Sequence, residues 1–283
     1  MTIHTVAAIQ MVSGNDLNKN LATARQLIEK AAIAGAKVIV LPENFAVFSA
    51  RQQYSIGLKE ASDERPIRSF IASLAKEHQV WIVAGTIPVA ADLDSTNEGD
   101  KSKVYSACFV YDDQGLERAR YNKMHLFDVD VADQQGSYRE SDTFLAGDCA
   151  VVIETPFGRL GLSVCYDIRF PELFRVMFNQ GVDIVAVPAA FTLKTGRAHW
   201  LPLLRARAIE NQCYVIGANQ GGQHSSSRET SGESVVIDGW GGVLAQRDMG
   251  EGIVVADIDL DKNKKLRQAM PCQRHIRFDT REI

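Results

Sequence analysis

Two patterns in the sequence predict an α/β fold. Short apolar runs rich in Val and Ile alternate with longer stretches whose apolar residues recur at helical spacing, which is typical of strands covered by helices. Two turn sequences, at residues 112–115 (Asp-Asp-Gln-Gly) and 238–242 (Asp-Gly-Trp-Gly-Gly), separate strand-like runs and predict hairpins. The expected fold therefore combines βαβ units with antiparallel pieces.

The elements follow in order along the chain. An alternating run predicts a first strand at residues 5–9, and a helix follows at 17–34, after the capping residues Asn15 and Asp16 and before Gly35. A basic run from Lys262 to Arg267 is interpreted as the solvated face of a C-terminal helix. The remaining predicted strands are 37–41, 80–85, 105–111, 160–164, 183–187, 214–218, 234–237 and 252–258, and the remaining helices are 68–76, 172–180 and 199–210.

Two polar segments are expected to be loops. One lies between Ala90 and Lys103, and the other, from Val129 to Gly147, is long for a compact domain and is therefore a candidate active-site loop. No linker, low-complexity tract or short repeat interrupts the chain. Residues 1–283 are therefore predicted to form a single domain.

Composition and charge limit the possible partners. The 283 residues are 46% hydrophobic and 23% charged, with 31 basic and 35 acidic residues, so no basic excess exists for binding nucleic acid or an anionic membrane. No apolar run approaches the roughly 20 residues of a membrane span, and the N-terminus lacks a secretory signal. We expect neither a nucleic acid nor a membrane partner, and a cytoplasmic location.

The cysteines and the missing motifs indicate that no cofactor or metal is bound. The 5 cysteines are scattered, with no Cys-x-x-Cys pair and no zinc-type spacing, so free thiols are expected. The dinucleotide, phosphate-loop and H-E-x-x-H motifs are absent. Residues 158–161 (Gly-Arg-Leu-Gly) are better explained by a hairpin turn than by a phosphate loop.

Cys165 stands where a strand-like run meets a helical one. Residues 160–164 (Leu-Gly-Leu-Ser-Val) lead directly into it, and a helix is predicted from Glu172. Because backbone N–H groups at a helix start favour the thiolate, we expect a thiol that faces solvent, has a lowered pKa and has oxyanion donors beside it. A buried apolar thiol is the common alternative, and this turn alone leaves that alternative open.

Two other candidates follow strand-like runs. Glu43 comes just after residues 38–42 (Val-Ile-Val-Leu-Pro), where a partly desolvated carboxylate could act as a general base. Lys123 opens the long loop, where an ammonium could stabilise an oxyanion. Taken singly, a helix cap or solvated loop carboxylate is the simpler explanation of Glu43, and a lone lysine is usually solvated.

A Cys-His pair, which would join Cys165 to His125 or His199 as in thiol proteases, is the alternative chemistry. The sequence allows it because the members of such a pair are neighbours in space rather than along the chain. This alternative predicts that His125→Ala or His199→Ala abolishes activity while Lys123→Ala is tolerated.

Taken together, the segments around Glu43, Lys123 and Cys165 resemble the nitrilase, or carbon-nitrogen hydrolase, superfamily with its Glu-Lys-Cys triad. The resemblance extends along the whole chain, and it is closest to the branch of small amidases that contains deaminated glutathione amidase and ω-amidase. One departure is visible, because Ala146-Gly147 stands where relatives often have Pro-Gly. The matching motifs lie at residues 41–43, 123–128, 165–172, 195–200, 205–210, 232–234 and 238–241.

The resemblance implies a four-layer α-β-β-α sandwich that pairs into a homodimer. It also implies that Cys165 is the nucleophile, Glu43 the general base, Lys123 the stabiliser of the tetrahedral intermediate, and Glu140 a second glutamate that supports the site. Tyr166 would supply an oxyanion N–H. For substrate binding we expect Arg169 to hold a carboxylate, with Thr195 and Phe191, on the loop after the 183–187 strand, in the pocket wall. Arg169 could equally form a local salt bridge, and the other two could be plain loop and core residues.

The activity implied is hydrolysis of the terminal amide of a small α-keto-acid amide to a carboxylate and ammonia, through a thioester. Residues 210–214 and 218–224 look closer to deaminated glutathione amidase. An ω-amidase acting on α-ketoglutaramate or α-ketosuccinamate is the alternative. An N-acyltransferase and a non-catalytic binding protein are more distant alternatives.

Overall fold

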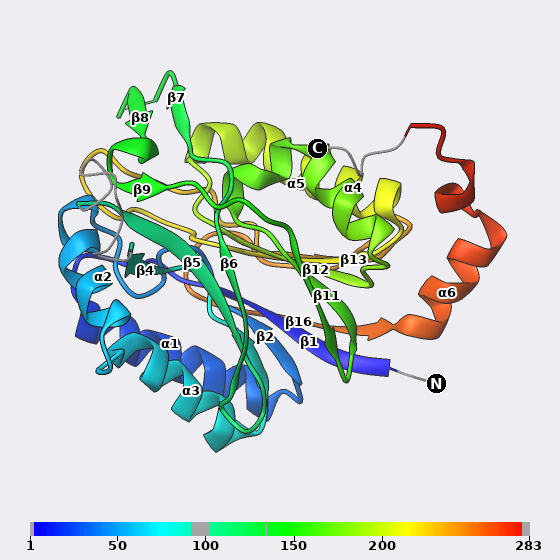
Figure 1. The fold of residues 1–283 in the computed structure, drawn as a ribbon, viewed down its shortest axis with the longest axis horizontal. Coiled ribbons are helices and arrows are strands. Elements are labelled where there is room, and N and C mark those ends of the chain that lie inside the picture. Colours follow the sequence, from blue (N-terminus) through cyan, green and yellow to red (C-terminus); the bar gives the residue numbers. More distant parts are fainter. Residues whose placement is uncertain (1–2, 92–101, 134, 279–283) are drawn as a thin grey trace.

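The computed structural model describes residues 3–91, 102–133 and 135–278. The polar loop expected between Ala90 and Lys103 lies mostly outside these residues. Two large sheets and six α-helices make up the described fold, together with a small two-stranded sheet. In Figure 1 the two large sheets lie between α1 and α3 on one side and α4 and α5 on the other, which is the α-β-β-α sandwich implied by the resemblance.

The first large sheet has eight strands in the order β16-β1-β2-β3-β5-β4, with β6 and β9 also paired to β5. The neighbours β1, β2 and β3 are parallel, whereas β16 is antiparallel to β1 and β6 is antiparallel to β5. Its strands are β1 (Ile3–Gln10), β2 (Val38–Val40), β3 (Trp81–Val83), β4 (Ile87–Ala90), β5 (Val104–Tyr111), β6 (Glu117–Asn122), β9 (Phe144–Leu145) and β16 (Gly252–Asp259).

The second large sheet has six strands in the order β10-β11-β12-β13-β14-β15. Its central strands β11, β12 and β13 are parallel, and hairpins flank them. The strands are β10 (Val151–Thr155), β11 (Gly158–Leu162), β12 (Ile184–Ala189), β13 (Tyr214–Asn219), β14 (Val235–Ile237) and β15 (Val243–Gln246).

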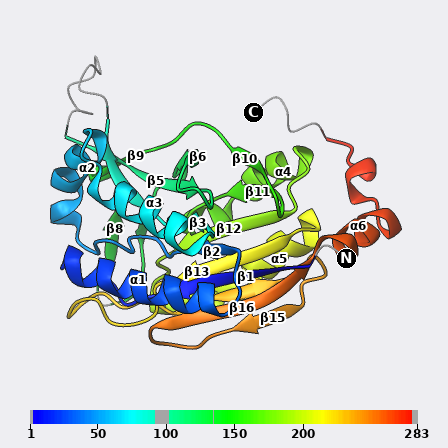
Figure 2. The same cartoon turned by 90° about the horizontal axis from the view of Figure 1, so that it is seen from below.

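Helices cover the outer face of each sheet. Figure 2 shows α1 and α3 across the eight-stranded sheet, and α6 lies at the far end of the molecule. The helices are α1 (Leu17–Ile33), α2 (Gln53–Ala61), α3 (Pro66–His78), α4 (Pro171–Asn179), α5 (Leu193–Asn211) and α6 (Leu260–Ala269). No helix among the described residues is long and apolar enough to cross a membrane.

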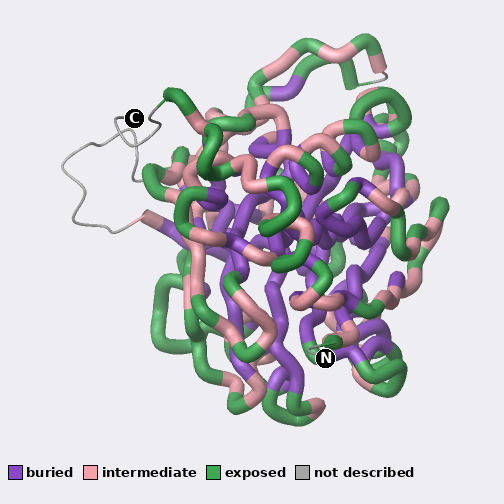
Figure 3. Tube along the Cα trace, turned by 90° about the vertical axis from the view of Figure 1, so that its right-hand side faces the viewer, coloured by how far each residue is buried: buried purple, intermediate pink, exposed green. Residues whose placement is uncertain are grey.

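Strand alternation sends side chains into two separate cores. In β1, Val6 and Ala8 face the core between the sheets, whereas Ala7 and Ile9 face the core beneath α1 and α3. This is the period of two expected of a strand whose two faces are both buried. Figure 3 shows the buried segments running through the middle of the molecule, with exposed turns around them.

Most of the predicted elements are confirmed with shifts of a few residues. All nine predicted strands and all four predicted helices are present, and α6 is the predicted basic C-terminal helix. The turns at 112–115 and 238–242 join antiparallel strands, as predicted, whereas residues 158–161, expected to form a hairpin turn, lie in β11 just after the turn that joins it to β10. The fifth helix begins at Leu193 rather than at His199, because the Thr192 side chain accepts a hydrogen bond from the Thr195 N–H and caps the helix there.

The expected loop from Val129 to Gly147 has more structure than its sequence indicated. It contains most of the hairpin of β7 (Asp128–Asp130) and β8 (Ser137–Arg139), a 3₁₀ turn at Glu140–Asp142, and β9. Strands of two or three residues are too short to show a period in the sequence. No helix was predicted from the sequence at α2, residues 53–61.

Candidate active site

A pocket of about 320 Å³ opens where several strands end. Glu43 follows β2, Lys123 follows β6, Cys165 follows β11 and Phe191 follows β12, and all four line the pocket. Open α/β sheets present their sites beyond the carboxyl ends of strands, because the side chains of successive loops converge there. The candidate site predicted from the sequence is therefore assembled in one cavity.

Cys165 occupies a strained turn between β11 and α4. The strand ends at Leu162, and Cys165 begins a 3₁₀ turn that runs to Arg169. Its φ of 47° lies in the left-handed region, which costs free energy for a residue with a Cβ and is found mainly at functional positions. The location at a strand-to-helix turn is as predicted.

The environment of the thiol differs from the expected one. Cys165 is only 8% exposed, and its pKa is raised well above the ordinary value, first by burial and then by the negative charge of Glu43. Lys123 and a backbone hydrogen bond from Ala190 act in the opposite direction and are outweighed. The prediction of a solvent-facing thiol with a lowered pKa is wrong, because the thiol is buried and the charge of the buried Glu43 carboxylate disfavours the thiolate.

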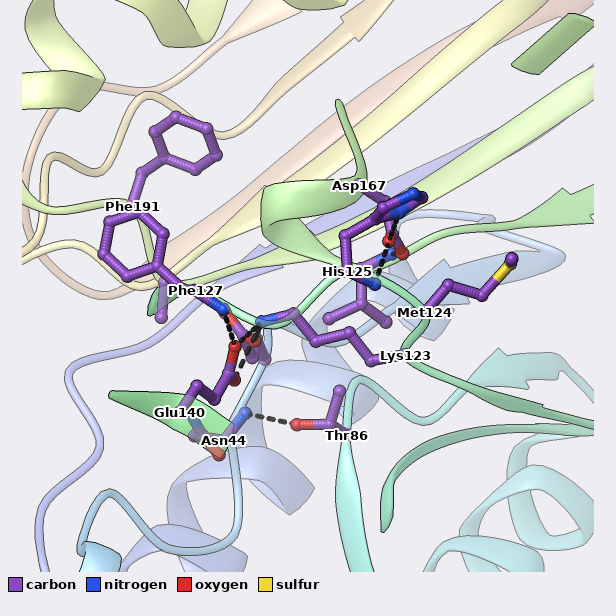
Figure 4. A network of polar contacts seen from close by, with 12 residues as sticks. Asn44, Thr86, Lys123, Met124, His125, Phe127, Glu140, Asp167 and Phe191 are labelled. Carbon is purple, nitrogen blue, oxygen red and sulfur yellow. Dashed lines mark hydrogen bonds and ion pairs between the residues drawn. The ribbon is translucent and has the colours of Figure 1, made fainter. Parts of the chain in front are cut away.

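A buried ion cluster around Lys123 lines the same pocket as the thiol, and Figure 4 shows Lys123 with Glu140 and Phe127. The Lys123 Nζ donates to Glu43 Oε1 at 2.8 Å and to both carboxylate oxygens of Glu140 at 2.8 Å. Lys123 is 1% exposed and Glu43 is 3% exposed. Glu140 also accepts a hydrogen bond from the Phe127 N–H at 2.6 Å. The three residues therefore form one network that holds the ammonium between two carboxylates.

The charges of this cluster decide the protonation of Lys123. Burial by itself lowers the pKa of a lysine, but the negative charges of Glu140 and Glu43 outweigh burial here and raise the pKa well above its ordinary value. Lys123 is therefore a fixed cation, as expected. Burial raises the pKa of Glu140, and the charge of Lys123 opposes that rise.

Backbone contacts fix the segment that carries Lys123. Its N–H donates to the Ser106 carbonyl at 3.0 Å, and its carbonyl accepts from the Gly147 N–H at 2.8 Å. A Cβ at position 147 would lie 2.1 Å from the Asn122 carbonyl oxygen, so the close approach requires glycine. The Ala146-Gly147 turn, where the sequence departs from its relatives, keeps the residue that this contact needs.

Asp167 links the lysine segment to the nucleophile turn. It is fully buried, and its carboxylate accepts hydrogen bonds from the Val164 N–H at 2.8 Å, the Tyr121 hydroxyl at 2.7 Å and the His125 N–H at 3.1 Å. The His125 Nδ1 lies 2.7 Å from the same carboxylate, and Figure 4 shows this pair. Asp167 therefore joins the residue before Cys165 to the residues on either side of Lys123.

The predicted substrate-binding residues divide into two groups. Tyr166, Phe191 and Thr195 line the pocket, and Thr195 belongs to the first turn of α5 rather than to the expected loop. Arg169 is not among the lining residues. Its Nη2 contacts the His199 Nδ1 at 3.2 Å, and its guanidinium carbon lies over the rings of Tyr166 and Phe191, at 5.9 and 5.6 Å.

Sequence reasoning missed part of the pocket wall. Phe48, Tyr138, His224 and Arg228 all line the cavity, and they come from three separate segments of the chain. His224 ends the run 218–224 that favoured one amidase subgroup, which was the only signal for it. Nothing in the sequence distinguishes Phe48, Tyr138 or Arg228 from ordinary loop residues.

The geometry gives no support to a Cys-His pair. His125 contacts Asp167 and stacks on Phe170 at 3.7 Å, and His199 contacts Arg169. Neither histidine lines the pocket with Cys165.

The described residues form neither a cluster suited to a metal ion nor a disulfide. Within residues 3–91, 102–133 and 135–278, no group of three or more His, Cys, Asp or Glu side chains is arranged to hold a metal ion. All 5 cysteines are free, as expected.

Comparison with known proteins supports the resemblance seen in the motifs. The carbon-nitrogen hydrolase family profile matches residues 5–268. A deaminated glutathione amidase of Yersinia enterocolitica is 39% identical over 96% of this chain and 93% of its own length. The human omega-amidase NIT2 is 36% identical over 99% of this chain and 97% of its own length.

A solved structure agrees with these relatives. The crystal structure of Saccharomyces cerevisiae Nit3, a member of branch 10 of the nitrilase superfamily, matches with a TM-score of 0.83 and 31% identity, over 95% of this chain and 94% of that one. The fold, the matched residues and the relatives agree with the motifs around Glu43, Lys123 and Cys165. The chain therefore belongs to the carbon-nitrogen hydrolase family of the nitrilase superfamily, and it is a hydrolase of carbon–nitrogen bonds other than peptide bonds.

Proposed function

We propose that this chain hydrolyses the amide bond of a small α-keto-acid amide through a thioester on Cys165, and that deaminated glutathione is its substrate. The observation that carries the mechanism is the buried cluster in which Lys123 contacts both Glu43 and Glu140 beside the Cys165 thiol. The substrate comes from the relatives, since the Yersinia enterocolitica protein carries the name deaminated glutathione amidase.

The first half of the proposed reaction forms the thioester. Glu43, which lines the same pocket, takes the proton of the Cys165 thiol, and the sulfur attacks the amide carbonyl carbon. The Lys123 ammonium and the Tyr166 N–H stabilise the oxyanion. The C–N bond then breaks, and Glu43 returns the proton to the departing nitrogen.

The second half releases the acid. Glu43 removes a proton from water, the resulting hydroxide attacks the thioester carbonyl, and the C–S bond breaks as Glu43 returns that proton to the sulfur. Because the raised pKa keeps the thiol protonated until substrate binds, proton transfer to Glu43 and attack belong to the same step. Glu140 is the positioning residue, since it holds Lys123 with two hydrogen bonds.

The leaving group differs between the two substrates considered. The amide nitrogen of deaminated glutathione belongs to cysteinylglycine, so hydrolysis yields 2-oxoglutarate and that dipeptide. The amide of α-ketoglutaramate is unsubstituted, so the ammonia expected from the sequence applies to that substrate. The pocket of about 320 Å³ extends beyond the three reacting residues to Arg228, which favours the larger substrate.

The test is a comparison of kcat/KM for deaminated glutathione and α-ketoglutaramate on the purified protein, with cysteinylglycine and ammonia measured as the respective products. We expect a clear preference for deaminated glutathione. A preference for α-ketoglutaramate would indicate an ω-amidase, which is the activity in the name of the human relative. Transfer of the acyl group to an added amine instead of water would indicate an N-acyltransferase, and no turnover of either amide would favour a binding protein.

A further inference from the structure

We infer that Arg228 binds a carboxylate group of the substrate. This inference rests on the proposed function, because it assigns a binding residue to the same pocket. The expectation that Arg169 holds a carboxylate remains a separate prediction, because Arg169 lies over the rings of Tyr166 and Phe191, whereas Arg228 is itself among the lining residues.

The cations that line the pocket differ in how far their hydrogen bonds are satisfied. Lys123 is held by two carboxylates. Arg139 pairs with Asp130 at 2.9 Å and donates to the carbonyls of Val129 and Tyr138. Arg228 donates from Nη2 to the Ala190 carbonyl at 2.9 Å, but its Nη1 is buried and has no partner in the part of the chain that the structure describes.

A buried guanidinium nitrogen without a partner is costly, because it has lost its hydration and gained no hydrogen bond. Planar guanidinium groups bind carboxylates with charge-assisted hydrogen bonds, which are the strongest replacement available. Because Nη1 is covered, a carboxylate reaches it once the Arg228 side chain turns that nitrogen toward the pocket. The unmet hydrogen-bonding capacity favours that turn when an anion is present.

Two aromatic rings restrict where the guanidinium can move. Its central carbon lies 4.8 Å from the ring centre of Tyr138 and 5.6 Å from that of Phe48. Phe48 in turn stacks on His224, with ring centres 4.0 Å apart. These contacts keep the charge at the pocket wall and leave its edge as the part that can meet an anion.

A single residue connects Arg228 to the nucleophile. The carbonyl of Ala190 accepts the hydrogen bond from Arg228, the backbone of Ala190 lowers the pKa of the Cys165 thiol, and all three residues line the pocket. An anion on Arg228 and a carbonyl carbon placed at the sulfur can therefore belong to one bound molecule.

Asp133 is a carboxylate whose pKa is lowered by the charge of Arg228. Burial raises the pKa of Asp133, but hydrogen bonds from Gly136, Tyr138 and Gln135 and the charge of Arg228 lower it overall. No ion pair between Asp133 and Arg228 is found within 4.0 Å in the described residues. Asp133 therefore offsets part of the charge of Arg228 without occupying its Nη1.

The experiment compares wild type, Arg228→Gln, Arg228→Lys and Arg169→Gln with charged and neutral substrates. The substrates are deaminated glutathione, α-ketoglutaramate, and two methyl esters of deaminated glutathione, one that masks the α-keto-acid carboxylate and one that masks the glycine carboxylate. We expect Arg228→Gln to lower kcat/KM about ten- to hundredfold for substrates that carry the bound carboxylate. For the ester that lacks that carboxylate, the loss should disappear, and Arg228→Lys should recover part of the activity.

The pattern of losses identifies the carboxylate. Equal loss with deaminated glutathione and α-ketoglutaramate places the α-keto-acid carboxylate on Arg228, whereas loss with deaminated glutathione alone places the glycine carboxylate there. A similar loss for all four substrates, no loss for any, or a charge-selective loss only in Arg169→Gln would overturn the assignment.

A binding measurement separates this inference from the proposed function. Calorimetric titration of the Cys165→Ala protein with 2-oxoglutarate and with cysteinylglycine needs no turnover. If wild type hydrolyses neither amide but Arg228→Gln weakens binding of one of these carboxylates about tenfold or more, the proposed function fails and the assignment stands. If neither carboxylate binds, or if Arg228→Gln binds both as well as its parent, the assignment fails on its own.

Discussion

The Cys165 thiol and the Glu43 carboxylate are both buried in the pocket wall, and the charge of Glu43 sets the chemistry of the thiol. Burial and the charge of Glu43 raise the pKa of Cys165, whereas Lys123 lowers it. A nucleophile of this kind becomes reactive when substrate arrives and Glu43 accepts the proton, rather than by standing as a free thiolate.

The first prediction follows from those signs. In Glu43→Gln the negative charge is gone while Lys123 remains, so the pKa of Cys165 falls and the midpoint of its alkylation by iodoacetamide shifts to lower pH. Amide hydrolysis should fall by about a hundredfold or more, because the general base is lost. Peptide mapping distinguishes Cys165 from the exposed Cys149. An unchanged or higher midpoint would contradict this account.

His224 gives a second prediction at the same scale. Burial lowers the pKa of His224 to about 4, and the charge of Arg228 adds to that effect, while a hydrogen bond to the Ser13 carbonyl opposes it. The unfolded chain binds a proton near pH 6.5, so the neutral histidine contributes stability that is present above that pH and is lost as the pH falls toward 4.

The measurement is urea unfolding of wild type and His224→Gln at pH 7 and pH 4. Wild type should lose about 3 kcal/mol more unfolding free energy between these two pH values than the variant. Equal losses in both proteins would mean that His224 titrates normally in the folded state.

At the scale of elements, Asp167 connects the segment after β6 to the turn after β11. Its carboxylate accepts from Val164, Tyr121 and His125, so it fixes the two backbone segments that carry Cys165 and Lys123 relative to each other. The sequence assigned Lys123 and Cys165 to two separate family motifs, but it did not show that the Asp167 carboxylate connects those motifs.

We predict that Asp167→Asn lowers kcat about tenfold or more and costs about 1–3 kcal/mol of unfolding free energy, since an amide cannot accept all of these hydrogen bonds. Asp128→Asn is the matched control, because Asp128 is exposed and accepts from the Ser141 N–H outside the pocket lining. If both variants lose activity equally, the link through Asp167 has no special role.

The elements also show how far the sequence could predict the fold. Strands such as β2 and β12 were predictable because both of their faces are buried, which leaves continuous apolar runs. The start of α5 was not predictable from periodicity, because a cap at Thr192 extends the helix across Gly196 and Arg197. The hairpin of β7 and β8 is too short for any pattern.

At the scale of the molecule, the pocket depends on contacts between segments that are far apart in sequence. The three motifs identified Glu43, Lys123 and Cys165 because each follows a strand, and the structure places them together. Arg228 could not be found in this way. Its significance lies in a buried nitrogen without a partner, which is a property of the folded chain and not of its local sequence.

The homodimer remains a prediction, and an exposed apolar patch suggests where to test it. The patch is defined as Ile209, Trp240 and Val243, which are 48%, 65% and 41% exposed, and the Ile209 side chain lies against Gly241 in the turn that joins Trp240 to β15. Exposed apolar clusters of this kind are typical of protein interfaces. We predict a dimer by light scattering and a shift toward monomer in Trp240→Glu.

Leu116→Glu is the matched control for that variant, since Leu116 is 58% exposed on the β5–β6 hairpin, outside the patch. A monomeric wild type, or a dimer that Trp240→Glu leaves intact, would show that this patch does not form the predicted interface.

The central claim is that Cys165 carries the acyl group of the substrate. The most direct measurement is intact-protein mass spectrometry after brief incubation with deaminated glutathione and acid quench, on wild type and Cys165→Ala. We predict a mass increase in wild type that corresponds to a 2-oxoglutaryl thioester, with cysteinylglycine released in step, and neither in the variant. Cysteinylglycine release without any adduct, or undiminished release by Cys165→Ala, would contradict the account.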